Sequence, residues 1–256
     1  MTNYKDFTIK VAREAGKFLM DNYGRIQSLD YRNRTDLKTE IDKRNDKLIR
    51  DAIRKEFPDH NIYSEEGDDA NTNSEFSWVV DPLDGTIPYT FGISDHFSIN
   101  IALVKGRVPI LGVTHAPKRN ELYVSEENRG AFCNDSRLQV SSVDNINHAV
   151  IGVDYGKFQR TEILDFHEKL LSKNGVTYPV SYGCASLSLA LVASGKLHGY
   201  LSLNLEPWDM AAGVLHNREA GGKVTTISGN EWELGDNSVL VANPALHEKL
   251  LELFRS

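Results

Sequence analysis

The chain has 256 residues and a formal net charge of −7 at neutral pH; this acidic balance, without a dense Lys/Arg patch, argues against a nucleic-acid polymer as partner. No apolar run approaches the roughly 18 residues of a membrane span, and the N-terminus lacks a secretory signal pattern, so we expect a cytoplasmic protein without membrane contact. Cys133 and Cys184 form no C-x-x-C motif, which argues against a disulfide framework and a cysteine metal site.

Two amphipathic helices are predicted at the start of the chain. Apolar residues recur at helical spacing across residues 4–23. A second helix is predicted over residues 40–56, where Thr39 and Asp42 form a capping-box pattern and Pro58 follows the last turn.

Strands dominate the chain after the second helix. The stretch NIYSEEG is predicted as a short strand that runs into an acidic loop, and SWVV as a strand that ends at Asp81. Apolar side chains occupy alternate positions over residues 97–104, which is typical of a strand. The segments VPILGVTHAP and ELYVSEE follow as further strands.

After about residue 140, strand-like and helix-like segments alternate. The predicted strands are AVIGVDY, VTYPV, HGYLSL and SVLVAN, and the predicted helices are 161–172, 185–194, 208–219 and 245–254. This alternation predicts an α/β half, residues 141–256, packed against an α+β half, residues 1–140.

Acidic residues gather at three borders of apolar segments, in SEEG, DPLDG and EPWDMAAG. Taken alone, SEEG is typical of a solvated loop, and Asp209 of EPWDMAAG can simply cap the helix that it begins. DPLDG is more specific, because a plain turn rarely needs two acids directly after a buried strand. Asp81, Asp84 and the carbonyl group between them offer the oxygen ligands that Mg²⁺ prefers, with a structural turn as the alternative.

Together with the upstream TDLKTEID, these motifs resemble those of the inositol monophosphatase family in their order and separation. The resemblance covers most of the chain, from the first helix to REAGG at 218–222. It implies a layered αβαβα sandwich, often a homodimer, and an enzyme that depends on Mg²⁺, in a family of which many members are inhibited by lithium. Two or three Mg²⁺ ions per active site are expected, and Mn²⁺ suits the same oxygen donors.

The resemblance also implies roles for individual residues. The implied metal ligands are Glu65, Asp81, the carbonyl of Leu83, Asp84 and Asp209, and Glu65 also borders a third, weaker ion site. Thr86 and Asp42 would orient the attacking water, Gly85 and Thr86 would contact the phosphate, and Glu66 would support the site from behind. Because the four acidic ligands repel one another, at least one carboxyl pKa should be raised until divalent cations neutralise the pocket.

The substrate contacts are less well defined by the motifs. GCAS at 183–186 falls where the family contacts substrate hydroxyl groups, which implies Gly183, Cys184 and Ala185, together with Asp209. Ser202 stands where many inositol-specific members have Glu, and the nearby Glu206 is either a substitute or a first-turn acid. After DPLDGT the chain has Ile-Pro-Tyr where inositol monophosphatases commonly have Thr-Asn or Lys-Asn, and both departures weaken the inositol assignment.

Three functions therefore stay open. The first is hydrolysis of a small phosphorylated metabolite, namely inositol monophosphate or a related polyol or sugar phosphate. The second is the same chemistry on histidinol phosphate, which a pocket acid would favour, or on 3'-phosphoadenosine 5'-phosphate, which an aromatic shelf and a basic pair such as Lys157 and Arg160 would favour. The third is a non-catalytic binding protein that kept the fold, which a replaced ligand residue would have supported.

Overall fold

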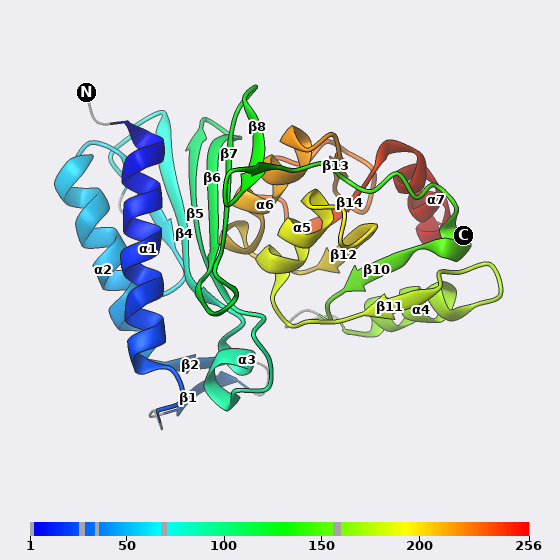
Figure 1. Ribbon diagram of the computed structural model, residues 1–256, viewed down its shortest axis with the longest axis horizontal. Helices are drawn as coiled ribbons and strands as arrows, with labels where there is room; N and C mark the ends of the chain where they lie inside the picture. The colour runs from blue at the N-terminus through cyan, green and yellow to red at the C-terminus, as the bar shows by residue number, and fades with distance from the viewer. Residues whose placement is uncertain (1–2, 26–28, 34–35, 68–70, 156–159, 256) are drawn as a thin grey trace.

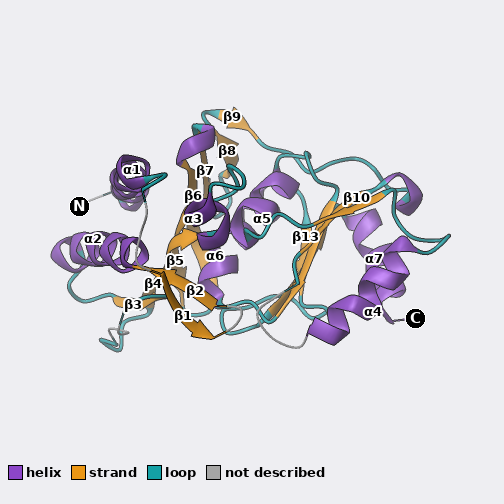
Figure 2. Cartoon of the chain, turned by 90° about the horizontal axis from the view of Figure 1, so that it is seen from below, coloured by secondary structure: helices purple, strands orange, loops and turns teal. Residues whose placement is uncertain are grey.

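The computed structural model describes residues 3–25, 29–33, 36–67, 71–155 and 160–255. Helices and sheets alternate in five layers (Figure 1, Figure 2). The outer layers are the helix pairs α1 with α2 and α4 with α7, and α5 and α6 lie between the two sheets. The predicted αβαβα sandwich is therefore confirmed. The longer helices are α1 (Tyr4–Asn22), α2 (Glu40–Glu56), α4 (Arg160–Leu171), α5 (Ala185–Ala193), α6 (Pro207–Glu219) and α7 (Pro244–Arg255).

The larger sheet has seven strands that follow one another in chain order. Neighbouring strands pair antiparallel, except β3 and β4, which pair parallel. The strands are β3 (Asn61–Ser64), β4 (Phe76–Asp84), β5 (Ser98–Lys105), β6 (Val108–Ala116), β7 (Glu121–Glu126), β8 (Gly130–Cys133) and β9 (Ser136–Arg137).

Both faces of the central strands are buried, because helices cover the larger sheet on each side. In β5, Ile99, Ile101 and Leu103 pack with α1 and α2, whereas Ala102 and Val104 pack with α5 and α6. The predicted alternation over β5 is thus real, and small apolar residues fill its second face. A sheet buried on both faces leaves its strand ends as the place where a polar site can form.

The smaller sheet is mixed and has the order β11-β10-β12-β14-β13. Strand β10 pairs parallel with β11 and β12, and β14 pairs antiparallel with β12 and β13. The strands are β10 (Val150–Val153), β11 (Tyr178–Val180), β12 (Gly199–Leu203), β13 (Lys223–Thr225) and β14 (Ser238–Ala242). The division of the chain near residue 140 falls between β9 and β10 and stays a prediction.

Two glycines let α6 lie close to its neighbours. A Cβ atom on Gly112 of β6 would lie 2.9 Å from the carbonyl oxygen of Ala212, and one on Gly213 would lie 2.6 Å from the side chain of Leu189 in α5. Without these side chains, α6 packs against the larger sheet and α5 at once. This packing fixes where the first turn of α6, which contains Asp209, meets the sheet.

Most predicted elements are present, and the capping box is confirmed: the N–H of Thr39 donates to Asp42 Oδ2 at 3.0 Å, and that of Asp42 donates to Thr39 Oγ1 at 3.4 Å. The described helices include none that is long and apolar enough to cross a bilayer. Besides β8, β9 and β13, the elements that sequence reasoning missed are β1 (Leu29–Asn33), β2 (Asp36–Thr39), α3 (Thr86–Phe91) and the 3₁₀ turns η1 (Pro117–Arg119) and η2 (Ile146–His148).

Candidate active site

The two aspartates of DPLDG lie on one face of β4 because the strand contains a bulge. The prediction that this strand ends at Asp81 is wrong, since β4 continues to Asp84. Asp81 pairs with Asn100 and Asp84 pairs with Ser98, so β4 carries one more residue than β5 between these pairs. Residues three apart in a regular strand point to opposite faces, and the extra residue brings both carboxylates to the same face. That face looks toward α5, where Ser98 Oγ lies 2.9 Å from Ser186 Oγ.

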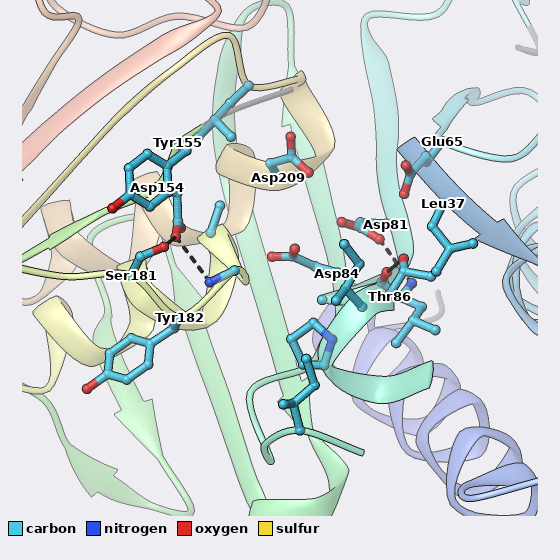
Figure 3. A pocket seen from close by; sticks show the side chains of 18 residues that line it. Leu37, Glu65, Asp81, Asp84, Thr86, Asp154, Tyr155, Ser181, Tyr182 and Asp209 are labelled. Carbon is cyan, nitrogen blue, oxygen red and sulfur yellow. Dashed lines mark hydrogen bonds between the residues drawn. The ribbon is translucent and has the colours of Figure 1, made fainter. Parts of the chain in front are cut away.

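Asp209 reaches the same place from the first turn of α6. Its Oδ2 accepts a hydrogen bond from the N–H of Glu206 at 2.8 Å, so Asp209 does cap the helix. It also joins Asp81 and Asp84, since one carboxylate oxygen from each of the three lies within 4.8 Å of the others. Figure 3 shows these side chains converging from β4 and α6. The capping and metal-ligand interpretations of Asp209 are therefore compatible.

The three aspartates form part of the wall of a cavity of about 460 Å³. Its wall combines the ends of β3 and β4, the start of α3 and the loop before α5 (Figure 3). The predicted site residues that line it are Glu65, Asp81, Leu83, Asp84, Gly85, Thr86, Gly183, Ala185 and Asp209.

Thr86 and Asp42 form a hydrogen-bonded pair at this wall. Thr86 Oγ1 lies 3.2 Å from Asp42 Oδ1 and 3.2 Å from the carbonyl oxygen of Leu83. The other oxygen of Asp42 accepts from Thr39 at the start of α2, which fixes the carboxylate from behind. Burial, together with the charge of Glu65, raises the pKa of Asp42 to about 6 in spite of its hydrogen bonds.

Three predicted substrate contacts do not line the cavity. The thiol of Cys184 is fully buried and donates to Asp84 Oδ2 at 3.3 Å, so it holds a carboxylate instead of a substrate. Burial raises the pKa of this thiol well above its usual range, which keeps it a donor. Ser202 is buried within β12, and Glu206 is exposed at the N-terminus of α6.

The N-terminus of α5 anchors Asp84. Besides the thiol of Cys184, Asp84 Oδ2 accepts a hydrogen bond from the N–H of Ser186 at 2.8 Å and another from its hydroxyl group. Burial nevertheless raises the pKa of Asp84 to about 6, and the charge of Asp154 adds to the effect. The strand and the helix thus hold a half-buried carboxylate for which no ion pair with a described residue is found.

Asp81 shows most directly that the site suits a cation. Its Oδ1 accepts from the N–H of Leu83 at 2.9 Å, whereas its Oδ2 is buried without a hydrogen-bond partner among the residues described. Burial raises the pKa of Asp81 well above its usual range, and the charges of Glu65, Asp84 and Asp209 raise it further. A divalent cation would satisfy the free oxygen and offset the repulsion, and hard oxygen ligands favour Mg²⁺ or Mn²⁺.

Sequence reasoning missed Asp154, which lines the cavity opposite Asp81, Asp84 and Asp209. Its Oδ1 accepts from Ser181 Oγ at 2.8 Å and from the N–H of Gly183 at 3.1 Å, and its Oδ2 accepts from the hydroxyl of Tyr200 at 2.8 Å. Asp154 therefore shapes the loop before α5. AVIGVDY carries the same signal as WVVD, an acid at the end of an apolar strand, and could have revealed it.

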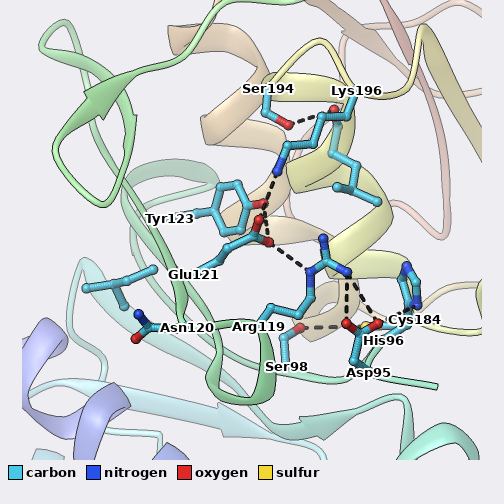
Figure 4. Close-up of polar contacts among 12 residues, drawn as sticks. Asp95, His96, Ser98, Arg119, Asn120, Glu121, Tyr123, Cys184, Ser194 and Lys196 are labelled. Atoms are coloured by element: carbon cyan, nitrogen blue, oxygen red, sulfur yellow. Dashed lines mark hydrogen bonds and ion pairs between the residues drawn. The ribbon is translucent and has the colours of Figure 1, made fainter.

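A polar network supports the loop that lies behind Gly85 (Figure 4). Gly85 has a φ angle of 84°, and a Cβ atom there would lie 2.5 Å from the carbonyl oxygen of His96. The neighbouring Asp95 pairs with Arg119 at 3.2 Å, and the His96 ring stacks on Tyr182 with the ring centroids 4.1 Å apart. Since Tyr182 lines the cavity, the network fixes two parts of the wall.

The half-buried charge of Asp84 predicts a pH-dependent difference in Tm between the wild type and Asp84→Asn, both without metal. The folded-state pKa of about 6 lies above the unfolded value of about 3.8, so the folded state binds the proton more tightly and loses stability as pH rises through 6. The variant lacks this cost. We expect its Tm to exceed that of the wild type at about pH 7.5 and the difference to shrink toward pH 5.

Thermal unfolding in EDTA across this pH range measures the difference directly. Burial lowers the pKa of His216 to about 3, so this histidine makes stability rise with pH, opposite to the effect of Asp84. Because both proteins contain it, its contribution cancels in the difference between their Tm values. A Tm difference that grows toward acid pH would contradict the raised pKa of Asp84 in the folded state.

Comparisons with known proteins agree with this geometry. The model of the inositol monophosphatase family matches residues 1–256. The chain is 35% identical to a fructose-1,6-bisphosphatase/inositol-1-monophosphatase of Thermotoga maritima over 97% of this chain and 94% of the relative. It is 34% identical to the Nus factor SuhB of Pasteurella multocida, over 96% and 93%.

The fold comparison gives the same result. The crystal structure of the extragenic suppressor protein SuhB from Bartonella henselae superposes with a TM-score of 0.92 at 30% identity and covers 98% of each chain. The family is metal-dependent and its named bisphosphatase and monophosphatase members support a phosphoric monoester hydrolase, in keeping with the acidic cluster. Motifs, fold and cluster lead to one assignment: the chain belongs to the inositol monophosphatase family.

Proposed function

We propose that this chain is a Mg²⁺-dependent phosphatase that hydrolyses a small phosphate monoester with a metal-activated water. The observation that carries the proposal is the convergence of Asp81, Asp84 and Asp209 on one cavity, beside the Thr86–Asp42 pair. Inositol monophosphate, or a related polyol or sugar phosphate, is the substrate class that the family match favours.

The chain would divide the reaction between two groups of residues. Glu65, Asp81, the carbonyl of Leu83, Asp84 and Asp209 would hold two or three Mg²⁺ ions, which supply positive charge to activate a water and stabilise the leaving oxygen. Thr86 Oγ1 would accept a hydrogen bond from that water and donate its own hydroxyl hydrogen to Asp42 Oδ1. Phosphoryl transfer requires mainly alignment and charge stabilisation, so the site needs no cysteine or histidine nucleophile.

An apolar and aromatic rim favours a second candidate, the nucleotide 3'-phosphoadenosine 5'-phosphate. Ile87, Ile93 and Tyr155 line the cavity and are 46%, 68% and 44% exposed, and Tyr182 lines it as well. A polyol offers these side chains little to bind, whereas an adenine ring can stack on them. The side chains of Lys157 and Arg160, the predicted basic pair, lie outside the described part of the chain.

Histidinol phosphate is less favoured by the structure than the nucleotide. The pocket acid that would bind its amine is Asp154, but both oxygens of Asp154 already accept hydrogen bonds within the protein. An amine would have to compete with these internal donors.

Phosphate release from a substrate panel tests the proposal. The panel contains inositol-1-phosphate, fructose-1,6-bisphosphate, histidinol phosphate and 3'-phosphoadenosine 5'-phosphate, each with Mg²⁺, with EDTA and with lithium. Turnover with Mg²⁺ that EDTA abolishes supports a metal-dependent phosphatase, and the highest kcat/KM selects the substrate class. Failure to hydrolyse any of them, with Mg²⁺ bound, would favour the non-catalytic alternative. The name of one relative, Nus factor SuhB, is consistent with that alternative.

We also propose that the protein is a homodimer, and analytical ultracentrifugation would test its oligomeric state.

A further inference from the structure

Lys38 is a lysine buried beside the metal cluster. It lies in β2, directly before the N-cap residue of α2, and its side chain is only 2% exposed. Removing an ammonium group from water is costly unless charged partners and hydrogen bonds replace the solvent. The surroundings of Lys38 must therefore supply both.

Two neighbouring glutamates do so. The Nζ atom of Lys38 lies 3.3 Å from Glu65 Oε1, forms an ion pair with Glu66 Oε1 and donates to the carbonyl oxygen of Glu65 at 3.2 Å. An ammonium group has three N–H donors, and these contacts provide three acceptors. The lysine is thus paired with two carboxylates and hydrogen-bonded to one carbonyl oxygen, and it contacts both the side chain and the backbone of Glu65.

The position of Glu65 makes this contact relevant to the metal centre. Glu65 lines the cavity, and its charge acts on both Asp42 and Asp81. Glu66 has a fully buried side chain behind it. The glutamate end of the acidic cluster therefore carries a fixed positive charge.

We propose that Lys38 is a built-in counter-ion of the metal centre. It holds Glu65 in its ligand position before metal binds, and it supplies the charge at the glutamate end that would otherwise attract a further divalent cation. Divalent ions then gather on the side of Asp81, Asp84 and Asp209, and the third ion expected beside Glu65 is not needed. The inference rests on the proposed metal-dependent function, but not on the choice of substrate.

Counting bound metal ions tests the role of Lys38 without any activity measurement. Mn²⁺ is the probe, because it suits the same donors and its free form is quantified by electron paramagnetic resonance. We expect wild type and Lys38→Arg to bind about two ions per chain. Lys38→Met and Lys38→Gln, which lack the charge, should each bind at least one more. Lys38→Gln keeps hydrogen-bond donors for the glutamates and so protects the fold.

Thermal unfolding with and without Mn²⁺ gives a second readout. The neutral variants should have a lower Tm than wild type in EDTA and a larger rise in Tm on addition of Mn²⁺, because the added ion replaces the lost charge. Lys47→Gln is the matched control, since it removes the same charge from an exposed position on α2 and should change neither quantity.

The outcomes separate the two proposals. A wild type that binds no Mn²⁺ would overturn the metal-dependent function itself. A wild type that binds Mn²⁺, with neutral Lys38 variants of equal stoichiometry and equal rise in Tm, would overturn the role of Lys38 alone. If both neutral variants fold only with Mn²⁺, the counter-ion role is supported, and if Mn²⁺ fails to restore their folding it is refuted.

Discussion

Asp84→Asn is expected to lower kcat by about a thousandfold or more while the protein stays folded. Asp84 is one of three carboxylates that converge within 4.8 Å, so its loss removes a charge from the cluster that would hold the metal. The fold survives because asparagine keeps one oxygen, which can still accept from the N–H and hydroxyl of Ser186. The measurement is steady-state phosphate release on the best substrate of the panel, with saturating Mg²⁺.

Metal binding distinguishes the cause of this loss. If Mg²⁺ binds the folded cluster and not the unfolded chain, it should raise the Tm of the wild type, and that rise should shrink in Asp84→Asn. Asp51→Asn is the control, since it removes the same charge from an exposed position on α2 and should leave both kcat and the rise in Tm unchanged. Near-normal turnover by Asp84→Asn would exclude Asp84 from the ligand set.

The elements that could be predicted from the sequence are those whose own residues carry a periodic or capping pattern. The first two helices, predicted over 4–23 and 40–56, are observed at Tyr4–Asn22 and Glu40–Glu56, because apolar periodicity and caps are local signals. The hairpin of β1 and β2 and the short helix α3 have too few residues for a periodic pattern. They depend on tertiary neighbours instead.

The bulge in β4 shows the limit of local reasoning most clearly. WVVDPLDG identifies two acids at a strand end, but which face each acid occupies depends on the register with β5. A single strand contains no information about that register. The metal interpretation of Asp81 and Asp84 was therefore predictable, whereas the bulge that makes both point the same way was not.

In the candidate site, too, some residues could be predicted from local motifs and others could not. Motifs predicted the carboxylates of Glu65, Asp81, Asp84 and Asp209 in the cavity wall, but neither Asp154 nor the groups that hold these carboxylates. Ser186, which anchors Asp84, is 102 residues away in the sequence, and Lys38 is 27 residues from Glu65. Such partners follow from how the layers pack, so no local pattern reports them. Cys184 illustrates the resulting error, because its place in GCAS indicated a substrate contact and packing turned it toward Asp84.

Thr86→Val is expected to lower kcat by roughly a hundredfold to ten-thousandfold with little change in metal binding. Valine has nearly the same shape as threonine, but it lacks the hydroxyl that lies 3.2 Å from both Asp42 Oδ1 and the carbonyl of Leu83. Without it, no described group links the water position to Asp42. The tests are kcat and KM on the best substrate, with the rise in Tm on Mg²⁺ addition as the measure of metal binding.

The double variant decides whether Thr86 and Asp42 act as a unit. If Asp42 works only through Thr86, then Asp42→Asn combined with Thr86→Val should be no slower than the slower single variant, because the second change removes nothing further. Thr86→Ser keeps the hydroxyl and should restore most of the activity. Losses that simply multiply would show that Asp42 acts on catalysis separately, for instance through the cap of α2 that its other oxygen forms with Thr39. A parallel loss of metal binding in Thr86→Val would instead place the hydroxyl in ordering the Leu83 carbonyl, since that oxygen is the second partner within its reach.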